Sequence, residues 1–281
     1  MSQPRKVWLV TGASRGLGRE LARAVLARGD VVVGTSRDGT ADLDAGAGSL
    51  HMLALDLAAP GREAQVVEQA HALHGRLDVL VNNAGYGLLG AVEEADEVET
   101  ARVFDVNFFG PLRLIRAALP FLRERRGGHI VNLSSIAGIA PMAGSGLYAA
   151  AKFALEGMSE SLAQEVAPLG LRVTVVEPGA FRTDFLSSQS IRHAPGRIAE
   201  YAATSGKVVS YLDQLQGKQL GDPVRGARAI IEAVESAEPP LHLLLGSDAL
   251  NRAREKLRKL GEEFDRWEPV SLGTDFPAGD R

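Results

Sequence analysis

Tyr148 and Lys152 lie four residues apart in the segment YAAAKFALEGMSESLAQEV, and Ser135 precedes the tyrosine by thirteen residues. Side chains four apart on a helix share one face, so the phenol and the ammonium can point into one site. A free tyrosine has a pKa of about 10, and a nearby ammonium lowers it. With the Ser135 hydroxyl to orient a carbonyl oxygen, the set could protonate an alkoxide while a hydride moves at carbon. By itself the pair also fits an ordinary surface helix.

A glycine-rich turn follows the first apolar run of the chain. KVWLV is typical of a buried strand, and RELARAVLARG of a helix that ends at Gly29. Between them, Gly12, Gly16 and Gly18 allow a sharp turn and a close approach to a pyrophosphate at the positive end of the helix. The spacing is G-x-x-x-G-x-G rather than G-x-G-x-x-G. A tight turn without a ligand is the alternative.

The end of the second predicted strand, VVVGTSR, bears on the choice of dinucleotide. NAD sites usually place an acidic residue here, whereas NADP sites place an arginine nearby. Ser36 stands at the acid's position and Arg37 follows it, while Arg15 in the glycine loop could supply a second guanidinium for a phosphate. We expect Asp38 to start the next turn, and Arg37 could alternatively be a solvated charge. The pattern favours NADP(H) over NAD(H).

Seven motifs in this order resemble the short-chain dehydrogenase/reductase family, strongly over roughly residues 5 to 185 and weakly to about residue 250. The matching residues are Thr11, Gly12, Gly16 and Gly18; Asp56; Asn82, Asn83, Ala84 and Gly85; Asn107; Ser135; Tyr148 and Lys152; and Pro178, Gly179 and Thr183. The resemblance implies a catalytic set of Ser135, Tyr148, Lys152 and Asn107, in which Asn107 holds a water for proton relay. It implies that Thr183 meets the nicotinamide carboxamide and that Asp56 contacts the adenine.

The cofactor-binding residues expected on these grounds are Gly12, Ser14, Arg15, Gly16, Leu17, Gly18, Ser36, Arg37, Asp56, Leu57, Asn83, Ala84, Gly85, Tyr148, Lys152, Pro178, Gly179 and Thr183. Two of the assignments have alternatives. Asp56 could instead cap the next helix, and an isolated Asn107 could be a satisfied core asparagine. Ser134 should face away from Ser135 if the strand continues, and we expect it to be structural.

The alternation of short apolar runs with amphipathic stretches predicts an α/β fold, a doubly wound parallel sheet of seven strands with helices on both faces, the Rossmann fold. We expect strands near 6–10, 31–35, 51–55, 78–82, 129–133, 171–176 and 241–245, and the longest helices near 98–126 and 147–167. The chain is read as one catalytic domain, 1–281. A substrate lid is expected at about 186–221 and a C-terminal extension at about 247–281.

Composition narrows the partners. The net charge of −4 and the absence of cysteine argue against nucleic acid and against thiolate metal sites, and the scattered histidines show no paired ligand motif, so no metal is expected. The apolar stretch of the N-terminus is too short for a signal peptide, and no membrane span is expected. A soluble cytoplasmic protein is predicted.

The loops at the carboxyl ends of the strands should bind substrate. They supply Leu88, Met142, Leu147, Phe181 and Phe185 with few charges, which indicates a mostly apolar ketone or secondary alcohol, although some of these residues could pack in the core. A sensor that binds NADP(H) without turnover is the alternative function.

A homodimer or homotetramer is predicted from the two longest helices. Apolar residues that we place on their outer faces could pair across a two-fold axis. These residues are Phe108, Phe109, Leu155 and Met158.

Overall fold

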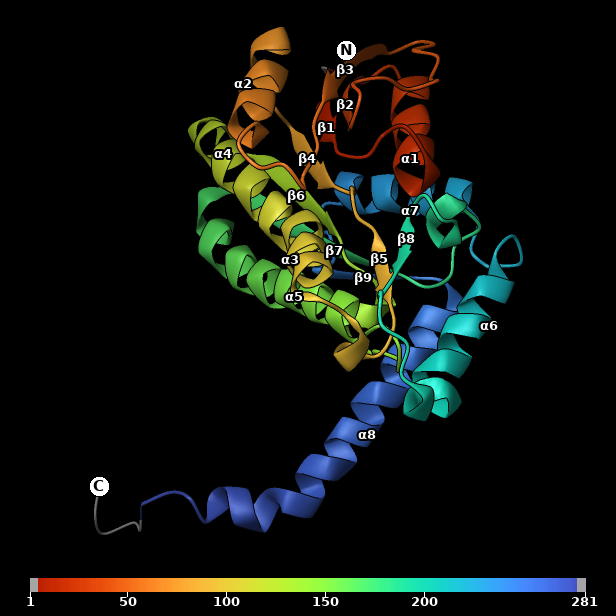
Figure 1. Ribbon diagram of the computed structural model, residues 1–281. Coiled ribbons are helices and arrows are strands. Elements are labelled where there is room, and N and C mark those ends of the chain that lie inside the picture. The colour runs from red at the N-terminus through yellow and green to blue at the C-terminus, as the bar shows by residue number, and fades with distance from the viewer. Residues whose placement is uncertain (1–4, 277–281) are drawn as a thin grey trace.

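The computed structural model describes residues 5–276 and contains a seven-stranded parallel sheet (Figure 1). Its strands are β1 (Val7–Val10), β2 (Val31–Ser36), β3 (Ser49–Ala54), β4 (Val79–Asn82), β6 (Gly128–Leu133), β7 (Leu171–Pro178) and β9 (His242–Leu245). They lie in the order β3-β2-β1-β4-β6-β7-β9, and all their pairings are parallel. The predicted Rossmann fold is confirmed, and the seven predicted strands are found with ends shifted by at most two residues.

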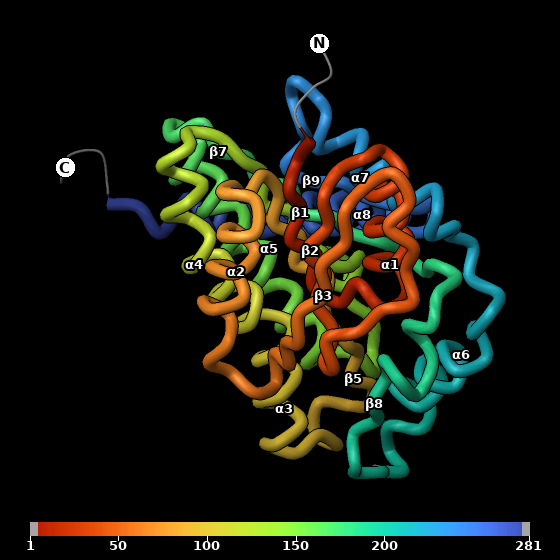
Figure 2. The backbone as a smooth tube through the Cα atoms, turned by 90° about the horizontal axis from the view of Figure 1, so that it is seen from above, coloured from red at the N-terminus to blue at the C-terminus, as the bar shows by residue number. Residues whose placement is uncertain are grey.

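Two helical layers cover the sheet, as Figure 2 shows from above. One contains α1 (Gly16–Ala27) and α7 (Pro223–Glu235), and the other contains α2 (Glu63–His74), α4 (Gly110–Arg125) and α5 (Gly146–Val166). The central strand β1 faces both layers: Trp8 and Val10 join the core under α1 and α7, whereas Val7 and Leu9 join the core under α2, α4 and α5. Successive side chains of a strand point to opposite faces, so an all-apolar strand can serve two cores.

The long helix expected near 98–126 is interrupted. It consists of α3 (Glu97–Phe104), the π-helical turn η2 (Asp105–Phe109) and α4. A π-helical turn adds one residue to the i→i−4 ladder and occurs frequently at functional sites. Asn107 lies in this turn and is fully buried.

Two of the residues placed on the outer helix faces lie elsewhere. Leu155 is fully buried, and Met158 packs against the core under α5. The reason is the helical period: α5 buries the stripe that runs through Tyr148, Lys152, Leu155, Ser159, Leu162 and Val166, so the face that carries the tyrosine and lysine also faces the sheet. Phe109 does remain exposed.

The segment predicted as a lid forms a separate layer over the carboxyl end of the sheet. It contains η5 (Asp184–Leu186), β8 (Ile191–His193), η6 (Ala199–Tyr201), η7 (Ala202–Gly206) and α6 (Lys207–Leu215). β8 pairs in parallel with β5 (Gly87–Leu89), which follows β4. This segment is therefore hydrogen-bonded to the loop beyond the fourth strand.

The C-terminal extension is mostly one helix, α8 (Ser247–Leu272), which projects from the body (Figure 1). Residues 277–281 of the extension lie outside the described part of the chain. Within residues 5–276, no helix combines the length and the apolar character that crossing a bilayer requires.

Candidate active site

The carboxyl ends of the central strands open into one large cavity of about 1430 Å³. Most of the residues expected from the sequence line it: Gly12, Ser14, Arg15, Gly16, Leu17, Ser36, Arg37, Asp56, Leu57, Asn83, Ala84, Gly85, Ser135, Tyr148, Lys152, Pro178, Gly179 and Thr183. Gly18 and Asn107 do not line it. The cavity therefore joins the glycine turn at one end to the tyrosine and lysine at the other.

The glycine turn is held in shape by the end of β4. Gly12 and Gly16 adopt φ values of +67° and +58°, which side chains disfavour. At Gly18 a Cβ would come within 2.2 Å of Asn83 Nδ2, so this glycine allows close packing and does not face the cavity. The Asn83 amide donates to the carbonyl oxygen of Thr11 at 2.8 Å, and the Thr11 hydroxyl accepts from the backbone of Asn83 at 3.0 Å.

The first turn of α1 is suited to an anion. No side chain caps its N-terminus, and it carries no acidic residue. Unpaired backbone N–H groups at such an end attract a phosphate, and the helix dipole adds to the attraction. The turn thus fits a pyrophosphate.

Arg15 and Arg37 lie near each other at this end of the cavity. Burial lowers the pKa of Arg15, and the charge of Arg37 lowers it further. Arg15 donates from its two terminal nitrogens to the side chain and backbone oxygens of Gln189 in the lid, each at 2.9 Å. Asp38 instead holds the turn after β2, because its carboxylate accepts from Ser36 Oγ at 2.8 Å and from the backbone N–H of Thr40 at 3.1 Å. Two cations therefore border the cavity where β2 ends.

Ser135 and Tyr148 meet at the other end. Ser135 follows β6 and caps the short helix η3 (Ile136–Gly138), accepting from Ala137 N at 3.1 Å. Burial raises the pKa of Tyr148 to about 12, and a hydrogen bond with Ser135 acts against that rise. The phenol is therefore protonated at neutral pH in this structure.

Lys152 is buried one turn further along α5. Its Nζ donates to the carbonyl oxygen of Leu133 at 2.8 Å and lies 5.8 Å from the centre of the Tyr148 ring. Burial lowers the pKa of Lys152 to about 8, and the carboxylate of Glu156 raises it. Proximity to the phenol is as expected, but the group that lowers the pKa of Tyr148 here is Ser135 rather than Lys152.

Asn107 lies directly behind the lysine. Its amide nitrogen donates to the carbonyl oxygens of Tyr86 at 3.0 Å and Val103 at 2.9 Å, while Oδ1 is buried without a hydrogen-bond partner among residues 5–276. A Cβ on Gly85 would come within 2.7 Å of that Oδ1 and 3.6 Å of Lys152 Nζ. A buried polar atom without a partner calls for a water, and this one lies close to the ammonium.

Asp56 does not cap a helix. Its carboxylate accepts from the backbone of Ala58 at 3.0 Å, and α2 begins only at Glu63. Asp56 therefore shapes the turn after β3, on the wall of the cavity.

A cluster of acidic residues behind Lys152 was not anticipated. Glu156 and Glu177 are both buried, and His242 Nδ1 lies 2.7 Å from Glu177 Oε1 and 3.8 Å from Glu156 Oε2. Burial raises the pKa of Glu156 to about 7 and that of Glu177 to about 8. Ser134 is buried and lowers the pKa of Glu156, and it lines the cavity together with Ser135 rather than facing away from it. Sequence spacing could not reveal this cluster, because it depends on the register that pairs β7 with β9.

The substrate end of the cavity is only partly as expected. Met142, Phe181 and Phe185 line it, whereas Leu88 and Leu147 pack in a core with Tyr86 and Tyr148. In β5 the neighbouring Leu89 lines the cavity instead, because successive strand residues face opposite ways. Further lining residues come from α6 and from charged positions that sequence analysis did not identify: Tyr211, Leu212, Leu215, Arg102, Arg192, His193, Asp248 and Arg252.

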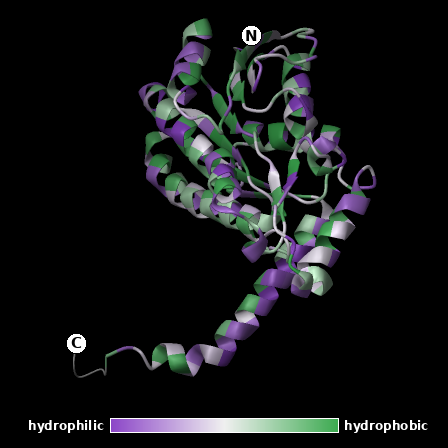
Figure 3. Cartoon of the chain, in the orientation of Figure 1, coloured by the Kyte–Doolittle hydropathy of each residue, from purple (hydrophilic) through white to green (hydrophobic). Residues whose placement is uncertain are grey.

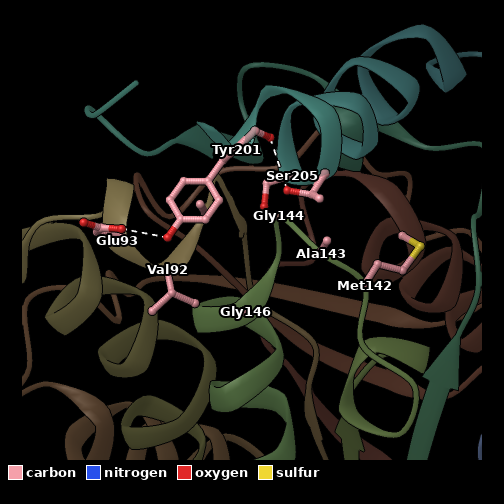
Figure 4. A pocket seen from close by; sticks show the side chains of 10 residues that line it. Val92, Glu93, Met142, Ala143, Gly144, Gly146, Tyr201 and Ser205 are labelled. Atoms are coloured by element: carbon pink, nitrogen blue, oxygen red, sulfur yellow. Dashed lines mark hydrogen bonds between the residues drawn. The ribbon is translucent and has the colours of Figure 1, made fainter. Parts of the chain in front are cut away.

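The segment around Ile198 and Tyr201 is hydrogen-bonded to the body of the protein beside a second, smaller pocket of about 470 Å³, shown in Figure 4. The Tyr201 hydroxyl donates to Glu93 Oε2 at 2.7 Å, and the backbone of Ile198 donates to Glu94 Oε1 at 2.9 Å. Met142 lines both pockets. These contacts fix one end of the lid to η1 (Val92–Glu94).

Known proteins resemble this chain in sequence and in fold. The family model for short chain dehydrogenases matches residues 6–193. The 3-ketodihydrosphingosine reductase of Bacteroides thetaiotaomicron is 37% identical over 244 residues, 87% of this chain and 88% of that protein. A short-chain dehydrogenase from Streptomyces avermitilis, whose crystal structure is known, is 42% identical in sequence. The two structures superpose with a TM-score of 0.89, covering 98% of this chain and 100% of that one. A metagenomic short-chain oxidoreductase, crystallised with NADP, is 30% identical, with a TM-score of 0.67 over 85% of this chain and 96% of that one.

Proposed function

Because this chain belongs to the short-chain dehydrogenase family, we propose that it transfers a hydride between NADP(H) and a ketone or secondary alcohol of mostly apolar character. The observation that carries the proposal is the cavity in which Ser135, Tyr148 and Lys152 face the same space that reaches the glycine turn. When bound, the dinucleotide supplies the hydride, and the remaining chemistry is a proton transfer at oxygen.

We assign that proton transfer to Tyr148. The hydroxyl of Ser135 orients the substrate oxygen, and the phenol of Tyr148 gives its proton to that oxygen as it becomes an alkoxide. Burial keeps the phenol protonated, which suits the donor role in the reducing direction. Lys152 stabilises the phenolate that remains and binds the ribose hydroxyls. A water on Asn107 Oδ1 returns the proton through Lys152.

The preference for NADP(H) follows from the cations at the end of β2. A 2′-phosphate placed between Arg15 and Arg37 would accept charge-assisted hydrogen bonds from both guanidinium groups. The oxygens of Gln189 now accept from Arg15 and would be exchanged for phosphate oxygens. The NADP complex of the metagenomic relative supports the assignment at the level of the family.

The substrate class follows from the lining of the lid end. The cavity offers apolar surface from Met142, Phe185, Tyr211 and Leu215, and Arg102 is among the charged residues that line it. A relative named 3-ketodihydrosphingosine reductase supports a ketone as the substrate. In this proposal residues 186–221 act as the lid within a single catalytic domain.

A cytoplasmic homodimer or homotetramer completes the proposal. The exposed aromatic rings of Phe109 and Phe153, 43% and 44% accessible, give η2 and α5 an outer apolar surface of the kind that helices bury between subunits.

A screen of NADPH oxidation tests the proposal. Hydroxysteroid-type, quinone, aliphatic keto and acyl-keto compounds are each offered with NADPH and with NADH. Turnover of an apolar ketone with NADPH is expected. Tight NADPH binding with no turnover of any compound would instead support the sensor.

A further inference from the structure

The outer part of α8 has no partner within the described chain. Its first turns pack on η3, and within the helix only Ala249 and Ala253 are buried. Between Arg254 and Phe276, where the described part of the chain ends, every residue is exposed except Leu260 and Gly261, which are half-buried. Figures 1 and 3 show this part extending from the body with apolar residues recurring along it. A short isolated helix is marginal in water, so a helix this exposed needs something to pack against.

The apolar residues of α8 follow a heptad. Leu250, Leu257 and Phe264 are seven residues apart, and Ala253, Leu260 and Trp267 each follow three residues later. Leu257, Phe264 and Trp267 are 62%, 64% and 56% exposed. Apolar residues in this spacing form the seam by which two helices pair in a coiled coil.

The charges along α8 select the partner and its direction. Residues 252–259 contain five basic side chains and one acidic, and residues 262–268 contain four acidic and one basic. A parallel pair of identical helices would set like charges side by side, whereas an antiparallel pair sets the basic half of each helix against the acidic half of the other. We propose that α8 pairs antiparallel with α8 of a second copy of this chain.

One pair of positions beside the apolar seam, Arg254 and Glu268, agrees with this pairing. Arg254 and Lys256 flank the seam in the basic half, Glu263 and Glu268 flank it in the acidic half, and none of the four forms an ion pair within residues 5–276. The ion pairs inside α8 use Arg258 and Lys259 with neighbouring glutamates. The flanking charges therefore remain available to a second helix.

The centre of the pair falls next to a glycine. When Leu257 faces Trp267 of the second copy and Leu260 faces its Phe264, the two-fold axis passes at Glu262, beside Gly261. No atom lies within 4 Å of a Cβ built on Gly261. A residue without a side chain lets the two backbones approach where the helices cross.

Charge reversal in the full-length protein tests the proposal by light scattering at about micromolar concentration. One variant combines Arg254→Glu with Lys256→Glu, a second combines Glu263→Lys with Glu268→Lys, and a third carries all four changes. Each of the first two gives the flanking positions of both halves the same charge and should halve the mass of the assembly. The four-fold variant restores opposite charges at the flanking positions and should recover the wild-type mass.

The outcomes separate the alternatives. A parallel pair would gain nothing from the four-fold variant, so failure of that variant to recover the mass overturns the antiparallel arrangement. A double variant, Leu257→Glu with Phe264→Glu, should also halve the mass, whereas Val98→Glu, an exposed apolar residue elsewhere, should leave it unchanged. If every α8 variant keeps the wild-type mass, the proposal is overturned. In that case, binding to phosphatidylserine vesicles that depends on α8 would assign the helix to a membrane surface. Circular dichroism confirms that each variant is folded.

Discussion

Lys152 is the residue whose surroundings say most about how the site works. It is buried, bonded to the Leu133 carbonyl and close to both Tyr148 and Asn107. Because burial lowers its pKa to about 8, the ammonium loses its proton at mildly alkaline pH. A side chain that must stay charged to stabilise a phenolate therefore sets an upper pH limit on the reaction.

Lys152→Met should reduce both kcat and NADPH affinity, since the ammonium has two roles. The wild-type rate should fall as the pH rises through about 8, and the mutant profile should lack that fall. Steady-state kinetics between about pH 6 and 10 measure the profiles, and fluorescence titration measures NADPH binding. Unchanged affinity together with an unchanged profile would reduce Lys152 to a packing residue.

The proposed preference for NADP(H) rests largely on Arg37. Arg37→Asp removes a phosphate partner and adds repulsion, and a hydrogen bond to a charged group contributes about 1.5–3 kcal/mol. NADPH affinity should fall about 10- to 100-fold while NADH affinity holds or rises. Arg228→Asp makes the same charge change at an exposed site on α7 and should alter neither. A wild-type protein that already prefers NADH would refute the assignment.

At the scale of the elements, the acidic cluster joins α5 to the edge of the sheet. Glu156 comes from α5, Glu177 from β7 and His242 from β9, and Lys152 and Ser134 border the cluster on the cavity side. The pKa values of both glutamates are raised by burial above 4.5, to about 7 and about 8. Their protonated forms therefore fit the folded protein better than their charged forms do.

The sign of the pH dependence follows. A carboxyl whose folded pKa is raised contributes stability that is complete below the unfolded value and is lost as the pH rises through the folded value. The free energy of unfolding should therefore decline between about pH 4.5 and 8. Glu156→Gln should flatten that decline, whereas Glu165→Gln, exposed on the same helix, should leave it unchanged. Urea unfolding at several pH values measures both, and a slope identical in all three proteins would contradict the argument.

At the scale of the whole molecule, sequence patterns predicted the features that depend on neighbouring residues in the chain. The strands follow from short apolar runs, and the glycine turn follows from residues that permit φ values such as those of Gly12 and Gly16. The proposed catalytic set follows from spacing along a helix together with the family resemblance. These features need few contacts between distant parts of the chain.

Features that depend on distant contacts were missed. The spacing of apolar residues near 98–126 predicts one continuous helix, so it gives no sign of the π-helical turn around Asn107. Leu155 was placed outside because its neighbours did not reveal which face of α5 meets the sheet. The pairing of β5 with β8 joins segments about a hundred residues apart. The sequence therefore could not show which residues of the segment 186–221 line the cavity.

The most direct test of the central claim is the turnover of Tyr148→Phe. Removing one hydroxyl takes away the proposed proton donor but leaves the ring, its packing on Phe185 and the cofactor contacts in place. On an apolar ketone that the wild type reduces, kcat should fall about 10²- to 10⁴-fold while the Kd for NADPH stays within about two-fold of the wild type. A variant that binds NADPH and keeps the wild-type kcat would contradict the assignment of Tyr148 as the proton donor.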